Sequence, residues 1–288
     1  MDELTKKRVI KDPVARIITT KYKHDIWKKF LAAIYDYQLI DENDKICVCI
    51  SGGKDSMLLA KCFMLYQAHI NPKVEIKYLV MNPGYNKENI DLIKHNVAIL
   101  GIPAEIISTN IFEIAYMQDH SPCYLCAKMR RGALYRLAQD MGCNKIALGH
   151  HYDDVIETTL MNMINAGSFQ TMLPKVHSDN YDNMELIRPL YYIRERDIIS
   201  WAKYNNLHFL QCACKFTETA YKEKESERYK TKMLIAKLEQ ENPNYAKNIF
   251  KANSNVVLDK VVGYKDSNGL HSFLDNYSNF KRPVKKNK

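Results

Sequence analysis

The sequence has no hydrophobic run of the length that crosses a membrane, and its first residues, Met1 to Arg8, lack the apolar core of a signal peptide. It also lacks a Walker motif of the form G-x-x-x-x-G-K-[ST], and it contains no evident repeat or low-complexity tract. These absences argue against a membrane protein and against a Walker-type nucleotide-binding protein. We expect a cytoplasmic protein.

The composition is that of a globular enzyme with one large or two small domains. The chain has 288 residues, of which 46% are hydrophobic and 26% are charged. A net charge of +9 suits a polyanionic partner such as nucleic acid. Part of this excess lies in the tail at 281–288, so a solvated terminus is the alternative to a nucleic-acid partner.

Strand and helix patterns alternate from residue 45 onward, which is typical of right-handed β-α-β crossovers. The fold class is therefore α/β, with an open, mostly parallel sheet that carries helices on both faces. The predicted strands are 45–50, 74–81, 104–108 and 145–149, and the predicted helices are 55–69, 86–100, 127–141 and 152–165.

The flanking segments are less regular. Residues 1–22 are basic without a strong period, and an amphipathic helix is predicted from His24 to Leu39. We predict three parts: an N-terminal helical segment at 1–40, a nucleotide-binding domain at 41–215, and a C-terminal helical extension with a basic tail at 216–288. Between 167 and 250 the prediction is a linker at 169–176, a short strand within 184–192, a helix at 195–204 and a strand at 207–211. Residues 226–250 are charged and helical in pattern, with one amphipathic helix and a stop at Pro243.

The most informative motif is Ser51-Gly52-Gly53-Lys54-Asp55-Ser56, directly after the first predicted strand. Two glycines allow a sharp turn with exposed N–H groups, and the following helix directs its positive end at the same point. The lysine and the hydroxyl groups add donors for a polyphosphate. This pattern predicts that ATP binds here, although a glycine-rich turn without a ligand is the alternative.

Other candidates follow neighbouring strands, whose carboxyl ends meet at one edge of a parallel sheet. Met81 offers backbone groups to an adenine edge, and Gly149 and His150 end the fourth strand. Asp153 and Asp154 are candidate Mg²⁺ ligands that support the loss of pyrophosphate, with Asp55 as a further catalytic candidate. The alternatives are a simple Asn-Pro-Gly turn after Met81 and helix capping by Asp153.

The eight cysteines fall into two groups. Four lie in or at the end of predicted strands and helices and are expected to be packing residues: Cys47, Cys49, Cys62 and Cys143. The others are candidate metal ligands: Cys123, Cys126, Cys212 and Cys214. Their spacing leaves open an iron–sulfur cluster with three cysteines, a zinc site, and a redox or persulfide function.

Arg130 and Arg131 follow Cys126 by about one helical turn. They are candidates for contacts with the phosphates of ATP or RNA, and a solvated helix face is the alternative.

Together these motifs resemble the tRNA 2-thiocytidine synthetases (TtcA-type) within the PP-loop ATP pyrophosphatases, over roughly residues 24–214. The resemblance is carried by residues 51–56, Cys123-x-x-Cys126 with Arg130 and Arg131, residues 148–163 and Arg188-Pro189-Leu190. It implies a PP-loop (adenine nucleotide alpha hydrolase-like) fold.

The resemblance also implies an activity. ATP would adenylate the C2 carbonyl oxygen of a cytidine in a tRNA anticodon loop, and sulfur would replace that oxygen. It implies ATP, Mg²⁺ and a [4Fe-4S] cluster held by Cys123, Cys126 and a third cysteine, for which we favour Cys212 over Cys214. A sulfur donor, such as a cysteine desulfurase or free sulfide, is implied as well, and a homodimer is left open.

Three other functions stay open on the sequence alone. They are thiolation of uridine or another tRNA base, ligation of an amine to cytidine, and a zinc-stabilised RNA-binding protein that retains the loop. The amine-ligating enzymes would not need Cys123 and Cys126.

Overall fold

The computed structural model describes residues 2–71, 73–117, 122–210 and 226–279. The chain divides into two compact units, residues 1–237 and residues 238–288. The predicted division at 1–40, 41–215 and 216–288 stays a prediction. Among the described residues, no helix combines the length and the hydrophobicity that a membrane span requires.

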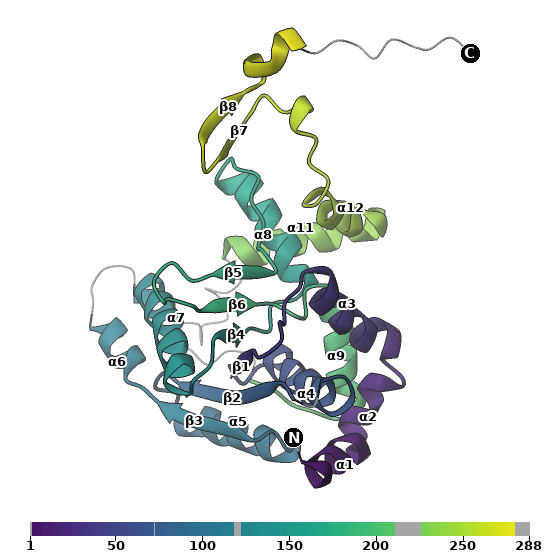
Figure 1. The fold of residues 1–288 in the computed structure, drawn as a ribbon, viewed down its shortest axis with the longest axis vertical. Helices are drawn as coiled ribbons and strands as arrows, with labels where there is room; N and C mark the ends of the chain where they lie inside the picture. The colour runs from purple at the N-terminus through teal and green to yellow at the C-terminus, as the bar shows by residue number, and fades with distance from the viewer. Residues whose placement is uncertain (1, 72, 118–121, 211–225, 280–288) are drawn as a thin grey trace. The chain divides into compact units, whose positions relative to one another are not determined.

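The first unit is built on a mostly parallel sheet, and the predicted fold class is confirmed. Within the described ranges the sheet has six strands in the order β3-β2-β1-β4-β6-β5, which Figure 1 shows stacked from β5 at the top to β3 at the bottom. Only β5 runs antiparallel to its neighbour. The strands are β1 (Lys45–Ile50), β2 (Glu75–Asn82), β3 (Ala104–Ser108), β4 (Lys145–Ala147), β5 (Lys175–His177) and β6 (Glu185–Ile187).

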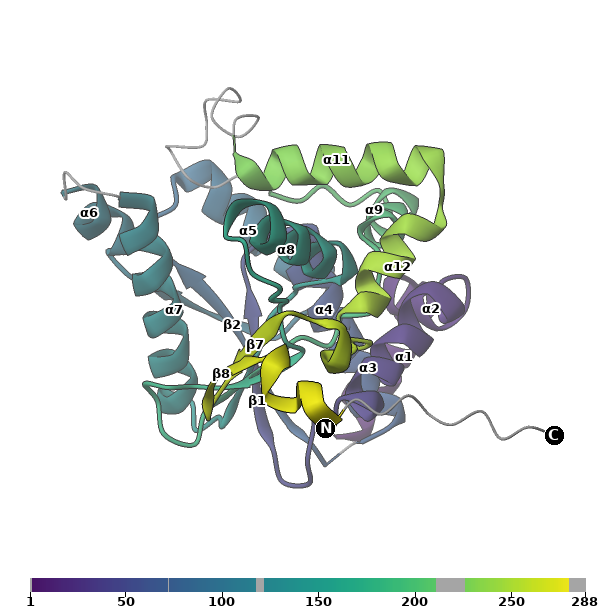
Figure 2. The same ribbon diagram turned by 90° about the horizontal axis from the view of Figure 1, so that it is seen from above.

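Helices cover both faces of this sheet. The side chains of β1 point alternately to one face and to the other, so that each face presents apolar side chains for a helix to bury. Cys47 and Cys49 pack in a core cluster with Tyr135 and Ala138 of α7 (Pro122–Asp140). Ile46, Val48 and Ile50 point to the opposite face, where α4 (Lys54–His69) contacts β1. Figure 2 shows α7 on one side of the sheet and α4 on the other, with the N-terminal helices beside α4. The predicted packing role of Cys47, Cys49, Cys62 and Cys143 is confirmed by their burial.

The N-terminal segment is helical from residue 3, although the weak period of residues 1–22 gave no bounds for its first two helices. Asp2 caps α1 (Glu3–Lys11) by accepting from Thr5 N–H at 2.8 Å. Asp12 caps α2 (Pro13–Thr19) by accepting from Val14 N–H at 2.8 Å. Asp12 also pairs with the buried Lys61 of α4, so these helices belong to the core. The predicted helix at 24–39 is a π-helical turn, η1 (Lys23–Trp27), followed by α3 (Lys28–Asp36).

At the amino ends of the strands, Lys145 is buried in a cluster of acids. Its Nζ lies 2.8 Å from Asp41, 2.6 Å from Asp44 and 3.0 Å from Glu185, and it donates to the Leu39 carbonyl at 3.1 Å. Burial lowers the pKa of Lys145, but these carboxylates outweigh burial and raise it. This ionic cluster joins β4, β6 and the loop before β1.

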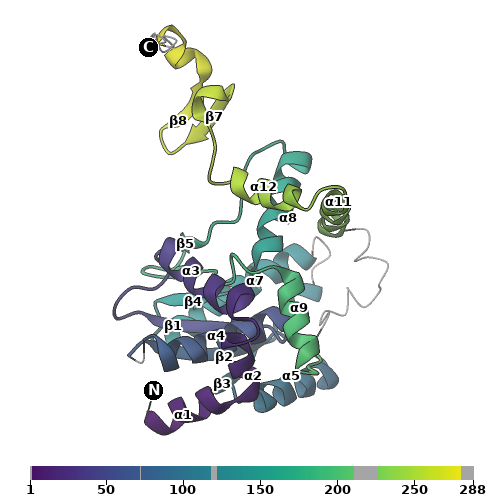
Figure 3. The ribbon, with the colours of Figure 1, turned by 90° about the vertical axis from the view of Figure 1, so that its right-hand side faces the viewer.

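The remaining elements of the first unit agree with the sequence in part. The predicted helix at 195–204 is α9 (Glu195–Tyr204), which packs on α4 and η1 (Figure 3). The predicted strand at 207–211 is wrong over 207–210, which carry no strand, and Gln211 lies outside the described residues. The predicted linker at 169–176 ends within β5. The other helices are α5 (Lys87–Ile99), α6 (Ile111–Tyr116), α8 (Tyr152–Asn165) and α11 (Glu227–Glu241).

The second unit contains more than the predicted helix. After α12 (Asn244–Ala252) and the turn η2 (Leu258–Lys260), strands β7 (Gly263–Asp266) and β8 (Gly269–Ser272) form an antiparallel hairpin, followed by η3 (Phe273–Asn279). The Asp266 carboxylate accepts from Asn268 N–H at 2.7 Å, and Gly269 has a φ of +125°. These are turn features that Asn268-Gly269 supports in the sequence.

Candidate functional site

The turn between β1 and α4 is braced by Ser56 and requires glycine at position 52. Ser56 Oγ donates to the Gly53 carbonyl at 2.9 Å and accepts from Ser51 N–H at 3.2 Å. Gly52 has a φ of +92°, and a Cβ there would lie 2.6 Å from Cγ1 of Ile93 on α5. Residues 51–56 therefore form a tight loop at the positive end of α4, as predicted.

The segment after β4 lies directly against this loop. A Cβ at Gly149 would lie 3.0 Å from the backbone carbon of Asp55 and from the backbone nitrogen of Ser56. Glycine permits this approach, and it brings His150 and His151 to the loop. His151 Nε2 lies 3.7 Å from Asp55 Oδ1. The predicted meeting of these two strand ends is confirmed.

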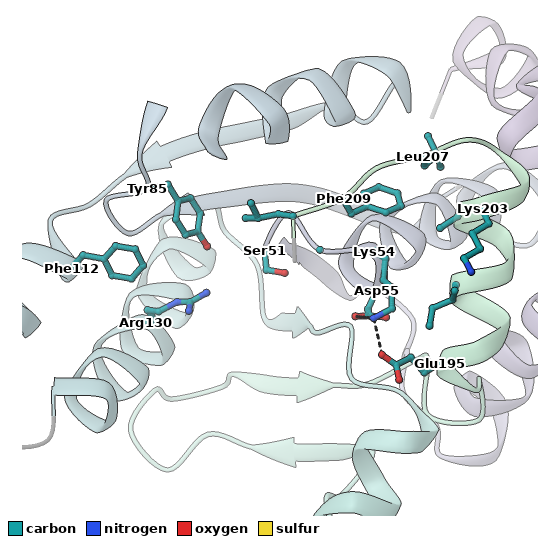
Figure 4. Close-up of a pocket in the computed structure, with 14 residues that line it drawn as sticks. Ser51, Lys54, Asp55, Tyr85, Phe112, Arg130, Glu195, Lys203, Leu207 and Phe209 are labelled. Atoms are coloured by element: carbon teal, nitrogen blue, oxygen red, sulfur yellow. Dashed lines mark hydrogen bonds and ion pairs between the residues drawn. The ribbon is translucent and has the colours of Figure 1, made fainter. Parts of the chain in front are cut away.

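A chain of charges extends from the loop to two distant helices. Lys54 Nζ lies 3.2 Å from Asp55 Oδ2 and 3.0 Å from Oε1 of Glu195, at the start of α9 (Figure 4). The other oxygen of Glu195 lies 2.5 Å from Nζ of Lys232 on α11. Burial raises the pKa of Glu195, but Lys232 and Lys54 outweigh burial and lower it to about 2. Glu195 is thus ionised and holds the loop lysine in place.

Two cavities meet at the loop and share Ser51, Asp55 and Arg130 as lining residues. The first cavity has a volume of about 670 Å³, and Figure 4 shows Tyr85, Phe112 and Arg130 on one side of it and Lys203, Leu207 and Phe209 on the other. Its other lining residues are Gly53, Lys54, Glu195, Ile199, Ala202 and Leu210.

The second cavity has a volume of about 390 Å³ and gathers most of the predicted nucleotide-binding residues. Both volumes are of the size that small-molecule sites have. The second cavity is lined by Cys49, Ile50, Ser51, Asp55, Ser56, Met81, Arg130, Leu134, Leu148, Gly149, His150, Asp154 and Arg228. Of the predicted set, Gly53 and Lys54 face the first cavity instead, and Gly52 supports the turn.

Two buried groups that line the second cavity have shifted pKa values. Burial raises the pKa of the Asp55 carboxyl, and burial lowers the pKa of His150 to about 4. His150 is therefore a neutral imidazole near pH 7. Within the described chain, Asp55 Oδ1 and His150 Nδ1 are buried and have no hydrogen-bond partner. Both atoms are available to a ligand.

The two aspartates of α8 have different surroundings. Asp154 lines the second cavity, accepts from His151 N–H at 2.8 Å and pairs with Arg228. Asp153 points to α9: its carboxylate lies 3.0 Å from Nη2 of Arg194 and accepts from Glu195 N–H at 2.6 Å. Asp153 lines neither of the two cavities. The capping alternative for Asp153 is wrong, because the capping box of α8 is formed by His151 and Asp154. Asp154, which also lines the second cavity, stays the candidate catalytic carboxylate of this pair.

The predicted metal ligands are described only in part. Cys126 is buried on α7 in a cluster with Met81 and Phe112, which line the second and the first cavity. Position 123 lies three residues earlier in α7. Cys212 and Cys214 lie outside the described residues. The segment before them is fixed at the loop, because Leu210 N–H donates to the Gly52 carbonyl at 3.3 Å.

Several residues of the site were not predicted from the sequence. Tyr85 and Phe112 pack edge to face with ring centroids 5.7 Å apart, and Phe209 stacks on Trp201 at 6.1 Å. Tyr85 directly follows the strand-end turn at 82–84, so the strand-end rule could have found it. Phe209 and Arg228 carry no such signal, because their places in the site depend on packing between distant elements.

Comparison with known proteins agrees with this geometry. A model of the PP-loop domain matches residues 22–218. The tRNA-cytidine(32) 2-sulfurtransferase of Geotalea uraniireducens (strain Rf4) is 38% identical over 239 residues, which cover 81% of this chain and 93% of that protein. The chain belongs to the tRNA-cytidine(32) 2-sulfurtransferase family of PP-loop proteins. The family predicted from the sequence motifs is therefore confirmed, and its members are transferases.

Two further comparisons extend this result. The family member from Ralstonia pickettii (strain 12J) is 34% identical over 253 residues, which cover 84% of this chain and 76% of that protein. Among solved structures, the U34-tRNA thiolase NcsA from Methanococcus maripaludis, with its [4Fe-4S] cluster, has a TM-score of 0.63 at 21% identity. That match covers 91% of this chain and 90% of NcsA, and it confirms the fold.

Proposed function

We propose that this protein is an ATP-dependent tRNA sulfurtransferase that thiolates C2 of a cytidine in the anticodon loop. Its membership in the tRNA-cytidine(32) 2-sulfurtransferase family supports the reaction and the substrate. We place the reaction in the cytoplasm, as the sequence predicts.

One observation carries the proposal: the cysteine helix and the phosphate loop face the same space. Arg130 lies one turn after Cys126 on α7, and it lines both cavities together with Ser51 and Asp55 of the loop. An activated base and a sulfur-bearing centre near Cys126 would therefore lie within one site.

In this proposal ATP lies in the second cavity. The backbone at Met81 meets the adenine edge, and the neutral His150 faces the nucleoside. The N–H groups of the loop hold the pyrophosphate end, and Lys54 reaches it from the first cavity, where the two cavities meet at the loop. Asp154 contributes one carboxylate to Mg²⁺, which commonly takes one or two protein carboxylates and completes its shell with phosphate oxygens and water.

The first step activates the base. The C2 carbonyl oxygen attacks the α-phosphorus of ATP, the bond to the β-phosphate breaks, and pyrophosphate leaves. Arg130, at the junction of the two cavities, is placed to stabilise negative charge on the α-phosphate. Sulfide then adds to C2, and AMP departs with the original oxygen as the C2–O bond breaks.

The residues present fit an iron–sulfur cluster as far as they are described. Positions 123 and 126 share one turn of α7, and Cys126 is buried in a cluster with Phe112, which lines the first cavity. Cys212, which we favour as the third ligand over Cys214, follows the loop-bound Leu210 by two residues. With three cysteine ligands, a bound [4Fe-4S] cluster supplies an iron with an open position for sulfide.

The first cavity suits the target base. Tyr85, Phe112 and Phe209 are aromatic surfaces of the kind on which unpaired bases stack. Lys203 at the cavity and the exposed Arg131 and Arg196 are candidates for contacts with tRNA phosphates. Arg194, near Arg196 in the chain, is held by Asp153 and is not counted among these candidates. A sulfur donor and a homodimer stay predictions.

The decisive experiment compares tRNA nucleosides from cells with and without the gene. We expect 2-thiocytidine to disappear when the gene is deleted and to return with the wild-type gene but not with Cys126→Ser. Unchanged 2-thiocytidine would refute the substrate, and loss of a different thionucleoside would redirect the proposal to another base.

A separate measurement tests the cluster. Protein purified without oxygen should contain about four iron and four acid-labile sulfide per chain and should lose both in Cys126→Ser. Zinc without acid-labile sulfide would support the zinc alternative instead.

A further inference from the structure

The second cavity contains a cation that comes from outside the matched PP-loop domain. The family model ends at residue 218, whereas Arg228 lies in the first turn of α11 and lines this cavity. Arg228 is 74 residues from Asp154 and 71 from Glu157 in the chain, yet its guanidinium contacts both carboxylates. The C-terminal part of the first unit therefore completes the nucleotide cavity.

Only part of this guanidinium is used by the protein. Nη2 of Arg228 pairs with Asp154 Oδ1, and Nε donates to Glu157 Oε2 at 3.0 Å. Within the described chain these contacts leave the N–H groups of Nη1 for a ligand. The Arg228 side chain is 47% exposed, while Asp154 and Glu157 are 17% and 7% exposed. The two largely buried carboxylates thus orient the more exposed guanidinium.

A second set of ion pairs connects α11 to the phosphate loop. Lys232 lies one turn after Arg228 on α11, and its ammonium binds Glu195, which in turn binds Lys54. Arg228 is therefore tied through α8 to the strand end that carries His150, and through α11 to the loop lysine. Arg228 thus lines the same cavity as Ser51, Asp55 and Ser56 of the phosphate loop.

We propose that Arg228 is a phosphate-binding residue of the ATP site that contacts the departing pyrophosphate through Nη1, while Nε and Nη2 stay on Glu157 and Asp154. A guanidinium has the planar arrangement of donors that matches phosphate oxygens. This proposal rests on the proposed function only in that ATP is the substrate, and it involves no bond-making step of its own.

The test measures binding of three probes to the full-length protein: ATP, inorganic pyrophosphate and adenosine. In Arg228→Met, we expect the dissociation constants of ATP and pyrophosphate to rise about 10- to 100-fold, as for loss of a charge-assisted hydrogen bond. Adenosine binding should be unchanged because adenosine has no phosphate. Arg228→Lys keeps the positive charge but loses the planar arrangement of N–H donors, so it should give an intermediate effect.

The matched control is Lys237→Met, which removes one positive charge from an exposed position of the same helix. It should leave all three dissociation constants unchanged. Two results would overturn the proposal: unchanged binding of ATP and pyrophosphate in both Arg228 variants, or adenosine binding weakened as much as ATP binding, which would show a structural role. No tRNA enters this test, so a failure to thiolate cytidine does not affect it.

Discussion

A lysine lies among carboxylates at the amino edge of the central sheet, where the strands begin, and another at the carboxyl edge, where they end. The two lysines differ in how fully the protein itself pairs them. At the amino edge, Lys145 is 2% exposed and meets three carboxylates and a carbonyl oxygen. At the carboxyl edge, the Lys54 side chain is 27% exposed, lines a cavity and shares Glu195 with Lys232.

The polar atoms around the two lysines differ in the same way. The Lys145 cluster uses its charges to join three parts of the chain. Around Lys54, buried atoms such as Asp55 Oδ1 and His150 Nδ1 keep no hydrogen-bond partner within the described chain. The difference teaches that a buried lysine does not by itself indicate a functional site. Buried polar atoms without hydrogen-bond partners beside a cavity do indicate one.

The largest expected effect is on stability at the amino edge. Lys145→Met should lower the free energy of unfolding by about 3–5 kcal/mol, because it leaves the buried Asp44 carboxylate without its cation and takes one of two lysines away from Glu185. Denaturant unfolding measures this change. Lys175→Met removes a more exposed lysine from the same cluster and should cost at most about 1 kcal/mol. Equal costs in the two variants would contradict the comparison.

The next effect is on catalysis at the carboxyl edge. Lys54→Met should lower the rate of ATP-dependent tRNA thiolation about 10²- to 10³-fold, as for loss of one group that stabilises developing charge. Single-turnover measurements of thiolated tRNA test this, with the unfolding midpoint measured alongside. A rate close to that of the wild type would show that Lys54 does not act on the phosphates.

A pair of glycines on either side of β4 sharpens the contrast. Gly149→Ala places a Cβ against the start of α4 and should weaken ATP binding about tenfold, since overpacking costs of order 1–3 kcal/mol. Gly142 has a φ of +75° and open space around it, so Gly142→Ala should cost about 1 kcal/mol of stability and leave ATP binding unchanged. Calorimetric titration with ATP and denaturant unfolding separate the two; ATP binding weakened equally in both variants would refute the contrast.

The smallest expected effect concerns acid. The folded-state pKa of Glu195 is about 2, below its ordinary value of 4.5. A lowered carboxyl pKa stabilises the fold above pH 4.5, and this contribution is lost as the pH falls toward 2. Because solvent screens the partly exposed Lys54 and Lys232, we expect about 1 kcal/mol. In Glu195→Gln, unfolding should depend less steeply on pH in this range, and an unaltered slope would contradict the assignment.

The sequence was sufficient where structure depends on local chemistry. Residues 51–56 and Gly149-His150 follow strands and Met81 lies near the end of one, and the shared edge of a parallel sheet brings them together. The ends of β1, β3, α8 and α9 were predicted from apolar pattern and caps. The π-helical turn before α3 has no comparable signal, and the start of α2 was missed although Asp12-Pro13 is a helix-start signal.

The sequence was insufficient where partners are remote. Asp153 and Asp154 are adjacent and chemically identical, and only packing against α9 and α11 assigns one to Arg194 and the other to Arg228. Glu195 was predicted to begin a helix, but its contact with Lys54 depends on how that helix crosses α4. Such contacts follow from tertiary packing, which no short motif records.

The absence of room at Gly52 has a consequence for engineering. Ile93 of α5 occupies the volume that a side chain at position 52 would need. The conformation of the phosphate loop therefore depends on α5 as well as on the loop's own residues. A bulkier or smaller aliphatic residue at position 93 would press on or relax the backbone amides without changing any polar group. Position 93 is thus a place to adjust nucleotide affinity by steric pressure alone, with the chemistry of the loop left intact.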